Sequence, residues 1–249
     1  MKHNIYIKIC VIIFILACTL VCEAKIYLVS AGISDYPGTE SDLSLPAKDA
    51  QTIAWLYSKN TDVSCTLLLD DKATKDNILS AMKSKFSKAK ENDIIVFFFS
   101  GHGYAGGFCS YDYALTYGDV RKAMASSKSQ NKMIFADACF SGEIRTNKRS
   151  SGSAVQAAQK ANVMLLLSSR SDETSLENRS MSNGYFTSSL QKGLRGGADA
   201  NKDRIITAME LYLYVHSNVI NATRDRQHPV MWGKFDDNMP VMIWTPKKK

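Results

Sequence analysis

The hydrophobic pattern of the chain predicts buried strands that alternate with helices. Apolar runs of strand length recur along the sequence and are separated by more polar segments. The runs are continuous rather than alternating, which is typical of strands covered on both faces. They are KIYLVSAG (25–32), VSCTLLLD (63–70), DIIVFFFS (93–100), KMIFADA (132–138) and ANVMLLLSS (161–169).

Two of the intervening segments, 46–60 and 74–90, carry apolar residues at helical spacing. Pro46 fits the first turn of the first segment, because the missing N–H has no partner there. The residues expected on the buried helix faces are Ala50, Ile53, Ala54 and Tyr57 in the first segment, and Ile78, Met82 and Phe86 in the second.

This order of elements indicates where chemistry takes place. Strand, helix, strand, helix implies right-handed crossovers, so we expect an α/β fold with a mostly parallel sheet and helices on both faces. Residues 25–249 contain no linker-like stretch and are expected to form a single domain. Ligands of open parallel sheets bind beyond the carboxyl ends of the strands, so the candidate residues are those that follow each run.

The first residues have the features of an export signal. Lys2 and Lys8 accompany an apolar stretch that is too short to cross a bilayer of about 30 Å as a helix. We expect residues 1–24 to be a signal peptide that is cleaved after Ala24. The alternative is lipidation at Cys18, which resembles a bacterial lipoprotein signal. In both cases the protein is exported, to the periplasm or the extracellular space, with no membrane-spanning helix.

Charge and cysteine content argue against a nucleic-acid-binding protein and against a disulfide-rich protein. The formal net charge of +7 becomes +6 without residues 1–24, which carry two Lys and one Glu. The basic residues are scattered, so we expect no nucleic-acid partner. The cysteines outside the signal are Cys65, Cys109 and Cys139, and this odd number does not indicate a disulfide framework.

A histidine and a cysteine follow two successive apolar runs. His102 lies in SGHG after the third run, and Cys139 lies in DACFSG after the fourth. If the two strands are neighbours, at a spacing of about 4.8 Å, both side chains face one cleft. A thiol beside an imidazole can attack a carbonyl and transfer protons, and the Gly103 amide can stabilise the resulting oxyanion. The alternative for Cys139 is a buried structural thiol.

These motifs resemble those of the caspase-like cysteine peptidases, and within them the metacaspase branch and its bacterial relatives. The resemblance extends over nearly the whole mature chain, through KIYLVSAGISDYPG, AKDA, SSRSDETSLE, NGYFTSSLQKGLRG and ADANKDRIITAMELYLYV. It implies a three-layer α-β-α, caspase-like fold with a six-stranded sheet. It also implies that Cys139 forms an acyl-enzyme and that His102 protonates the leaving amine.

The resemblance further implies cleavage after Arg or Lys. Two carboxylates line the primary specificity pocket of the metacaspase branch, and they match Asp137 and Asp49 of this chain. Paired carboxylates replace the hydration of an incoming guanidinium or ammonium group. The alternatives are that Asp49 stabilises its helix N-terminus and that Asp137 satisfies backbone amides. Caspases that cleave after Asp usually have Gln in place of Asp137, which argues against that specificity.

The region around Cys139 has two further features. Phe140 stands where many metacaspases have His, and we expect the mouth of the pocket to differ while catalysis survives. The stretch EIRTNKRSSGSA (143–154) is typical of an exposed loop. Its basic residues, Arg145, Lys148 and Arg149, are candidate self-cleavage points.

The stretch DANKDRIITAME (199–210) has the ligand spacing of an EF-hand calcium loop. Arg204 departs from that pattern, because the sharp turn normally needs Gly. The alternative is a structural turn whose acidic residues cap the last helix. The residues at ligand positions are Asp199, Asn201, Asp203, Ile205, Thr207 and Glu210. The dyad itself needs no cofactor for its chemistry, and calcium at this loop is the one cofactor that the sequence suggests.

The sequence thus predicts an exported cysteine endopeptidase that acts on a peptide or protein substrate. Two other functions stay open: a catalytically weak caspase-like protein that binds or scaffolds a partner, and a legumain-like or clostripain-like peptidase of other specificity. The presence of both His102 and Cys139 favours an enzyme, since inactive relatives commonly lose one of them. By analogy with metacaspases we expect a monomer.

Overall fold

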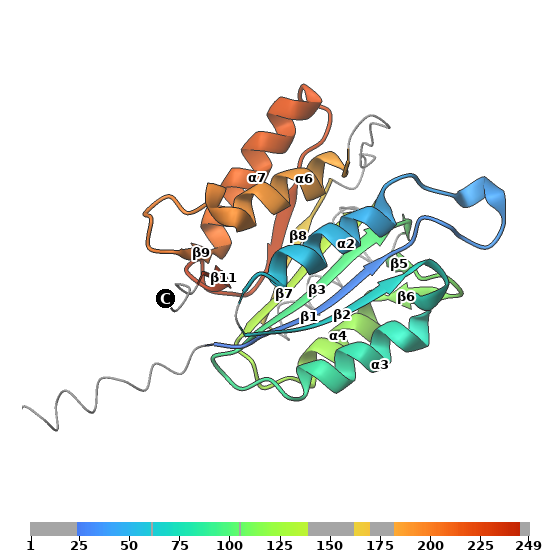
Figure 1. Ribbon diagram of the computed structural model, residues 1–249, viewed down its shortest axis with the longest axis horizontal. Helices are drawn as coiled ribbons and strands as arrows, with labels where there is room; N and C mark the ends of the chain where they lie inside the picture. Colours follow the sequence, from blue (N-terminus) through green and yellow to red (C-terminus); the bar gives the residue numbers. More distant parts are fainter. Residues whose placement is uncertain (1–23, 61, 105, 139–161, 170–181, 245–249) are drawn as a thin grey trace, which may run out of the picture.

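The computed structural model describes residues 24–60, 62–104, 106–138, 162–169 and 182–244. The strands of its central sheet are β1 (Ile26–Gly32), β2 (Val63–Leu69), β3 (Ile94–Gly101), β7 (Asn131–Ala138), β8 (Val163–Leu167) and β10 (Val230–Gly233). The six-stranded sheet has the order β10-β8-β7-β3-β1-β2 (Figure 1). All neighbours are parallel except β10, which runs antiparallel to β8. The predicted mostly parallel, six-stranded sheet is confirmed.

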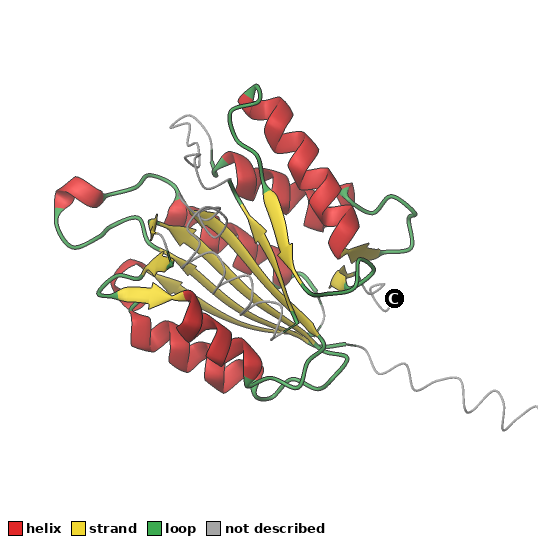
Figure 2. Ribbon diagram, turned by 180° about the vertical axis from the view of Figure 1, so that it is seen from behind, coloured by secondary structure: helices red, strands yellow, loops and turns green. Residues whose placement is uncertain are grey.

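Helices cover both faces of this sheet (Figures 1 and 2). They are α2 (Pro46–Tyr57), α3 (Lys75–Phe86), α4 (Tyr117–Ala125), α6 (Tyr185–Lys192) and α7 (Ala208–Thr223). Side chains of α2, α6 and α7 share one hydrophobic cluster with one face of the sheet, and those of α3 and α4 share a second cluster with the other face. The three-layer α-β-α architecture is therefore confirmed.

Smaller elements extend the two ends of the sheet. β4 (Gly103–Tyr104), β5 (Gly107–Cys109) and β6 (Ala114–Thr116) form a three-stranded sheet, and β9 (Ile205–Thr207) pairs with β11 (Pro240–Ile243). The short helices are η1 (Thr39–Ser41), η2 (Asp70–Lys72) and η4 (Gly193–Gly197), and η4 continues α6. These elements and β10 are only two to five residues long, which is too short for a hydrophobic pattern to identify them.

The predicted strands match the observed ones in position, and all but one match in burial. β1, β3 and β8 are buried throughout, and β7 is buried from Lys132 onward. β2 differs, because its residues are mostly half-buried and Leu67 is 39% exposed. The prediction that this run is covered on both faces is wrong, since β2 is the edge strand beyond β1.

The predicted helix faces are confirmed. Every residue expected to be buried on the two helices is buried: Ala50, Ile53, Ala54, Tyr57, Ile78, Met82 and Phe86. The start of α3 is fixed by the Thr74 side chain, which accepts a hydrogen bond of 3.2 Å from the backbone N–H of Asn77.

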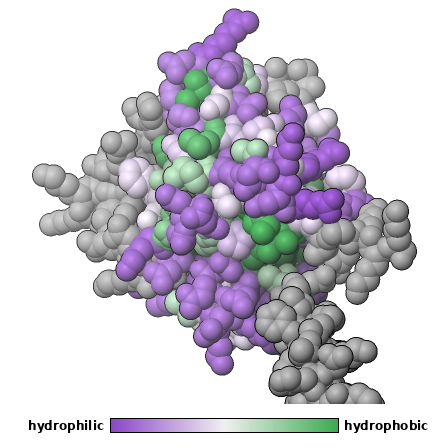
Figure 3. All heavy atoms as spheres, turned by 90° about the vertical axis from the view of Figure 1, so that its left-hand side faces the viewer, coloured by the Kyte–Doolittle hydropathy of each residue, from purple (hydrophilic) through white to green (hydrophobic). Residues whose placement is uncertain are grey.

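The surface is largely polar where Figure 3 displays it, with smaller hydrophobic areas between hydrophilic side chains. The large apolar side chains that are exposed come from separate elements; Trp55 lies on α2, Leu67 on β2 and Leu213 on α7. Among the described residues, no helix has both the length and the apolar character needed to cross a bilayer.

The first turn of α2 crosses the carboxyl end of β1 at close range. A Cβ atom added at Gly32 would lie 2.2 Å from the carbonyl oxygen of Pro46 and 2.7 Å from Cβ of Ala50. Only glycine permits this approach. The contact fixes the part of α2 that carries Asp49.

We therefore predict that Gly32→Ala destabilises the protein by about 1–3 kcal/mol, because the added methyl group pushes α2 away from the sheet. Urea denaturation measures the change. Gly118→Ala is the matched control, since its added Cβ would meet nothing closer than Thr116 Oγ1 at 3.5 Å. Equal free energies of unfolding for the two variants would show that the close approach is not required.

Candidate active site

The two central strands β3 and β7 end together at the carboxyl edge of the sheet. Their parallel register pairs Gly101 with Ala138, the last residues of both strands. His102 and Cys139 are the residues that follow this pair in the sequence. The expectation that the third and fourth runs are neighbouring strands is confirmed.

Several predicted features lie outside the described residues. These are Cys139, Phe140, the 143–154 stretch and the signal segment up to Glu23. Gly103 is described and is the first residue of β4, where it pairs with Phe108. Its role as an oxyanion donor stays a prediction.

His102 is half-buried and is held from both its backbone and its ring. The His102 backbone N–H donates to Tyr36 Oη at 3.0 Å, and the two rings lie 5.0 Å apart between centroids. Nε2 of His102 lies 2.8 Å from the carbonyl oxygen of Ser41 in η1. A carbonyl oxygen can only accept, so Nε2 carries the proton of this hydrogen bond. Nδ1 of the neutral ring is then the nitrogen that can take up a proton.

Tyr36 connects His102 to the small sheet beside it. Its hydroxyl accepts from His102 and donates to the carbonyl oxygen of Cys109 at 3.0 Å. Burial raises the pKa of Tyr36 far above its ordinary value of 10.0, so the phenol stays neutral and can serve as donor and acceptor at once. Tyr36 follows the carboxyl end of β1, but no short motif in the sequence pointed to a role for it.

Asp49 is buried in the first turn of α2 and points to other elements of the fold. Its Oδ2 accepts from Ser100 Oγ of β3 at 3.0 Å. Its Oδ1 accepts from Asn183 Nδ2 at 2.8 Å and from the backbone N–H of Gly184 at 3.2 Å. In the described part of the chain, no hydrogen bond joins this carboxylate to amides of α2 itself. The hydrogen bonds of Asp49 thus run to β3 and to the start of α6, while its place in the first turn of α2 also fits the alternative that it stabilises this helix end.

Asp137 is buried near the end of β7 and reaches the same place. Its Oδ2 accepts from the side-chain hydroxyl of Thr187 at 2.8 Å and from the Thr187 backbone N–H at 3.2 Å. A Cβ atom added at Gly184 would lie 2.8 Å from Asp137 Oδ2 and 3.6 Å from Asp49 Oδ2. Two carboxylates that are distant in the sequence thus both lie beside one glycine.

The electrostatics of this pair are unfavourable when both groups are charged. Burial raises the pKa of Asp49 well above its ordinary value of 3.8, and the nearby charge of Asp137 raises it further. Hydrogen bonds from Asn183, Ser100 and Gly184 favour the charged form and act in the opposite direction. A cation between the two carboxylates would relieve the repulsion.

The residues that hold the carboxylates were not recognised in the sequence. Ser100 lies in register with Asp137 on the neighbouring strand, and Asn183, Gly184 and Thr187 lie at the start of α6. The stretch NGYFTSSL was noted as part of the resemblance, and this was the one signal that pointed to them. Their contacts join distant segments, which hydrophobic periodicity does not reveal.

The 199–210 loop is closed by hydrogen bonds from its own backbone. Asp199 accepts from the N–H groups of Asp203 at 3.2 Å and Arg204 at 3.0 Å. Asp203 accepts from the N–H of Ile205 at 2.7 Å, and Asn201 Oδ1 accepts from that of Asp203 at 3.0 Å. Arg204 has φ of +70°, the left-handed conformation for which glycine is normally needed.

Glu210 caps α7 from within this loop. Thr207 and Glu210 form a capping box, with side-chain to backbone hydrogen bonds in both directions. The turn in which an acidic residue caps the last helix is therefore present. Among the described residues, no three His, Cys, Asp or Glu side chains converge to hold a metal ion. The calcium site stays a prediction.

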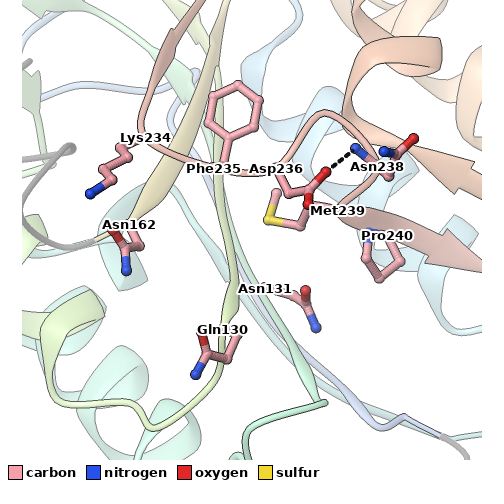
Figure 4. A pocket seen from close by; sticks show the side chains of 9 residues that line it. All are labelled: Gln130, Asn131, Asn162, Lys234, Phe235, Asp236, Asn238, Met239 and Pro240. Carbon is pink, nitrogen blue, oxygen red and sulfur yellow. Dashed lines mark hydrogen bonds between the residues drawn. The ribbon is translucent and has the colours of Figure 1, made fainter.

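A cavity of about 550 Å³ lies at the other end of the central strands (Figure 4). It is lined by Asn131 at the start of β7, by Asn162 just before β8 and by the loop 234–240. None of the predicted site residues lines it. His102 and the two carboxylates lie at the carboxyl ends of these strands, so the cavity does not belong to the candidate active site.

Comparisons with known proteins agree with this geometry. The caspase domain family matches residues 29–239 of the chain. The fold is similar to a protein from Geobacter sulfurreducens, with a TM-score of 0.65 and 15% identity, covering 88% of this chain and 97% of that one. It is similar to caspase-1 from Spodoptera frugiperda, with a TM-score of 0.63 and 13% identity, covering 91% and 92% of the respective chains. No curated protein sequence matches the chain.

We predict that Asp49→Asn stabilises the fold at neutral pH, because asparagine keeps the shape and is neutral, whereas Asp49 must either be buried as a charge or take up a proton on folding. The folded protein holds a proton on Asp49 that the unfolded chain has already lost, so the stability of the wild type falls as pH rises from about 4 through the raised pKa. The expected gain at neutral pH is on the order of 1 kcal/mol or more, because the pKa of Asp49 is raised well above its ordinary value.

Urea denaturation at several pH values measures this gain. It should be absent at the lowest pH, where both states are protonated, and it should grow as pH increases. Asp35→Asn is the control, because Asp35 is exposed and a change there should stay within about 0.5 kcal/mol. A pH-independent difference between wild type and Asp49→Asn would contradict the proposed cause.

Proposed function

Because the chain belongs to the caspase domain family, whose members are cysteine peptidases, we propose that it is an exported endopeptidase that cleaves after Arg or Lys. Cys139 and His102 form its catalytic dyad. The observation that carries the proposal is the meeting of Asp49 and Asp137 at the edge of the sheet where β3 leads into His102.

In the proposed mechanism, Nδ1 of His102 takes the proton of the Cys139 thiol, and the thiolate attacks the substrate carbonyl carbon. The amides of Gly103 and Cys139 stabilise the oxyanion. The carbon–nitrogen bond then breaks, the proton of His102 passes to the leaving amine, and a thioester remains. Water attacks the thioester with His102 as general base, which releases the acid and restores the thiol.

The contacts of His102 support this role. The Ser41 carbonyl holds the proton on Nε2, which leaves Nδ1 available as the base. Tyr36 limits rotation of the backbone at His102. Together these contacts orient the ring before a substrate arrives.

The carboxylate pair supports specificity for basic residues. A guanidinium or ammonium group placed beside Asp49 and Asp137 gains two charge-assisted interactions and lowers their mutual repulsion. An acidic substrate residue would add a third negative charge to a buried site. The pocket therefore favours Arg and Lys and rejects Asp.

The start of β1 supports export with cleavage after Ala24. Ile26 is the first residue of β1, and the backbone N–H of Lys25 donates to Asp93 Oδ1 at 2.9 Å. Asp93 is buried, and its Oδ2 accepts from the N–H of Lys90 at 2.7 Å. Cleavage would turn the Lys25 N–H into a cationic amine facing this carboxylate. An amino terminus at Lys25 would therefore be stabilised by the Asp93 carboxylate at the start of β1.

A calcium ion at the 199–210 loop is a further part of the proposal. The support is the spacing of its oxygen-bearing residues together with the left-handed turn at Arg204, which follows the EF-hand backbone at this position. Calcium would compete with the backbone N–H groups now bound by Asp199 and Asp203. The loop would then stabilise the start of α7.

We predict that the purified mature protein hydrolyses fluorogenic peptides ending in Arg or Lys, and not those ending in Asp or Asn. Cys139→Ala should abolish hydrolysis, because the nucleophile is lost. His102→Ala should lower kcat by at least about 100-fold, because proton transfer is lost. Steady-state kinetics on the four peptide series measure these changes, with calcium and with chelator.

Ser126→Ala is a matched control, since this residue lies at the end of α4, far from the proposed dyad in the fold. Equal hydrolysis by wild type and Cys139→Ala, or none by the wild type, would favour a binding or scaffold protein. Preference for Asn would instead favour a legumain-like peptidase. Calcium dependence that persists in Asp199→Ala with Glu210→Ala would exclude this loop as the calcium site.

We also predict that export of the full chain from a bacterial host yields a protein that begins at Lys25. Intact mass of the exported protein measures this. Cys18→Ser should leave the mass unchanged, because cleavage after Ala24 does not use that thiol. A lipid-modified mass at Cys18 that disappears in this variant would show a lipoprotein signal instead.

A further inference from the structure

The first turn of α6 contacts both carboxylates of the proposed specificity pocket. Asn183 and Gly184 donate to Asp49, and Thr187 donates to Asp137 through its backbone and its hydroxyl. Asp49 belongs to α2 and Asp137 to β7, so the start of α6 connects two elements by hydrogen bonds to both carboxylates. The hydrogen bonds from α6, together with that from Ser100 of β3 to Asp49, hold the two carboxylates relative to each other.

The donors of α6 are neutral, and this determines their effect on the pocket. They are two backbone N–H groups, a side-chain amide and a hydroxyl. Such donors orient carboxylate oxygens without supplying the positive charge that would cancel them. The N–H groups of Gly184 and Thr187 lie at the helix N-terminus, where intrahelical acceptors are missing and negative charge is favoured. The turn stabilises the charge that a basic side chain needs.

Gly184 is required by the closeness of this arrangement. An added Cβ would stand 2.8 Å from Asp137 Oδ2, which is shorter than side-chain contacts of this kind allow. Its φ of −56° and ψ of 158° are accessible to any residue, so a substitution here costs no backbone strain. The effect of a side chain at 184 would therefore come from displacement of the Asp137 carboxylate, which Thr187 now holds in place.

We propose that Gly184 and Thr187 are specificity-determining residues, which place the carboxylate of Asp137 beside that of Asp49 for recognition of a guanidinium or ammonium group. The inference rests on the proposed basic specificity and names the residues that create it. Gly184 and Thr187 act through Asp137 and are positioning residues. If these residues had only a structural role, they would stabilise α6 without changing the preference of the site for a cationic side chain.

The test compares two alkylating reagents on the full mature protein. Iodoacetamide is neutral and reports the reactivity of Cys139 alone, whereas a peptidyl arginine chloromethyl ketone must also place its guanidinium in the pocket. Peptide mapping by mass spectrometry follows Cys139 separately from Cys65 and Cys109, which are half-buried. The measured quantity is the ratio of the two rates at Cys139.

We expect Gly184→Ala to lower this ratio at least about tenfold, because Asp137 is displaced. Thr187→Val should lower it by about tenfold, since one hydrogen bond to a charged oxygen is lost. Thr187→Ser should restore a ratio close to that of the wild type, because the hydroxyl is kept. Gly118→Ala is the matched glycine control and should leave the ratio unchanged.

Two results would overturn the inference while leaving the proposed function intact. One is a wild type that selects the cationic reagent together with a Gly184→Ala protein that selects it equally. The other is a parallel fall of both rates in Thr187→Val, which would indicate a structural role. If Gly184→Ala does not fold, the comparison of Thr187→Val with Thr187→Ser alone tests the inference. A wild type that does not select the cationic reagent would overturn the proposed specificity itself.

Discussion

The in-register pairing of β3 with β7 is the constraint on which the rest of the site depends. Both strands are buried on both faces, so a slip of one residue would turn apolar side chains such as Phe98 toward the wrong helix layer. The apolar core therefore fixes the register, and the register carries Ser100 and Asp137 to the same level of the sheet. The positions of the site residues at the carboxyl edge are therefore fixed by apolar packing between residues that do not belong to the site.

The carboxylate pair at the carboxyl edge of the sheet lowers the stability of the fold. Two acidic groups are buried close together, and neutral donors from β3 and α6 offset only part of the penalty. A structure selected for stability alone would place apolar residues here. In the proposed function this cost is offset when a substrate side chain of opposite charge binds between the two groups.

The fold was accessible from the sequence because it is encoded in continuous apolar runs. Periodicity located the central strands and the buried residues of α2 and α3, and it failed at β2 because an edge strand can be as apolar as a central one. His102, Asp49 and Asp137 were recognised through short motifs. Tyr36, Asn183 and Thr187 were not, since their partners lie far away in the sequence and only the tertiary structure brings them together.

The hydrogen bond between His102 and Ser41 has a consequence for how this family member can change by mutation. The acceptor is a main-chain carbonyl, which every amino acid supplies, so no exchange of the side chain at position 41 deletes it. A side-chain carboxylate in the same role would be lost by a single codon change. The orientation of the histidine is therefore robust to substitution and sensitive to loop length, so insertions and deletions around η1 are the changes that selection should resist.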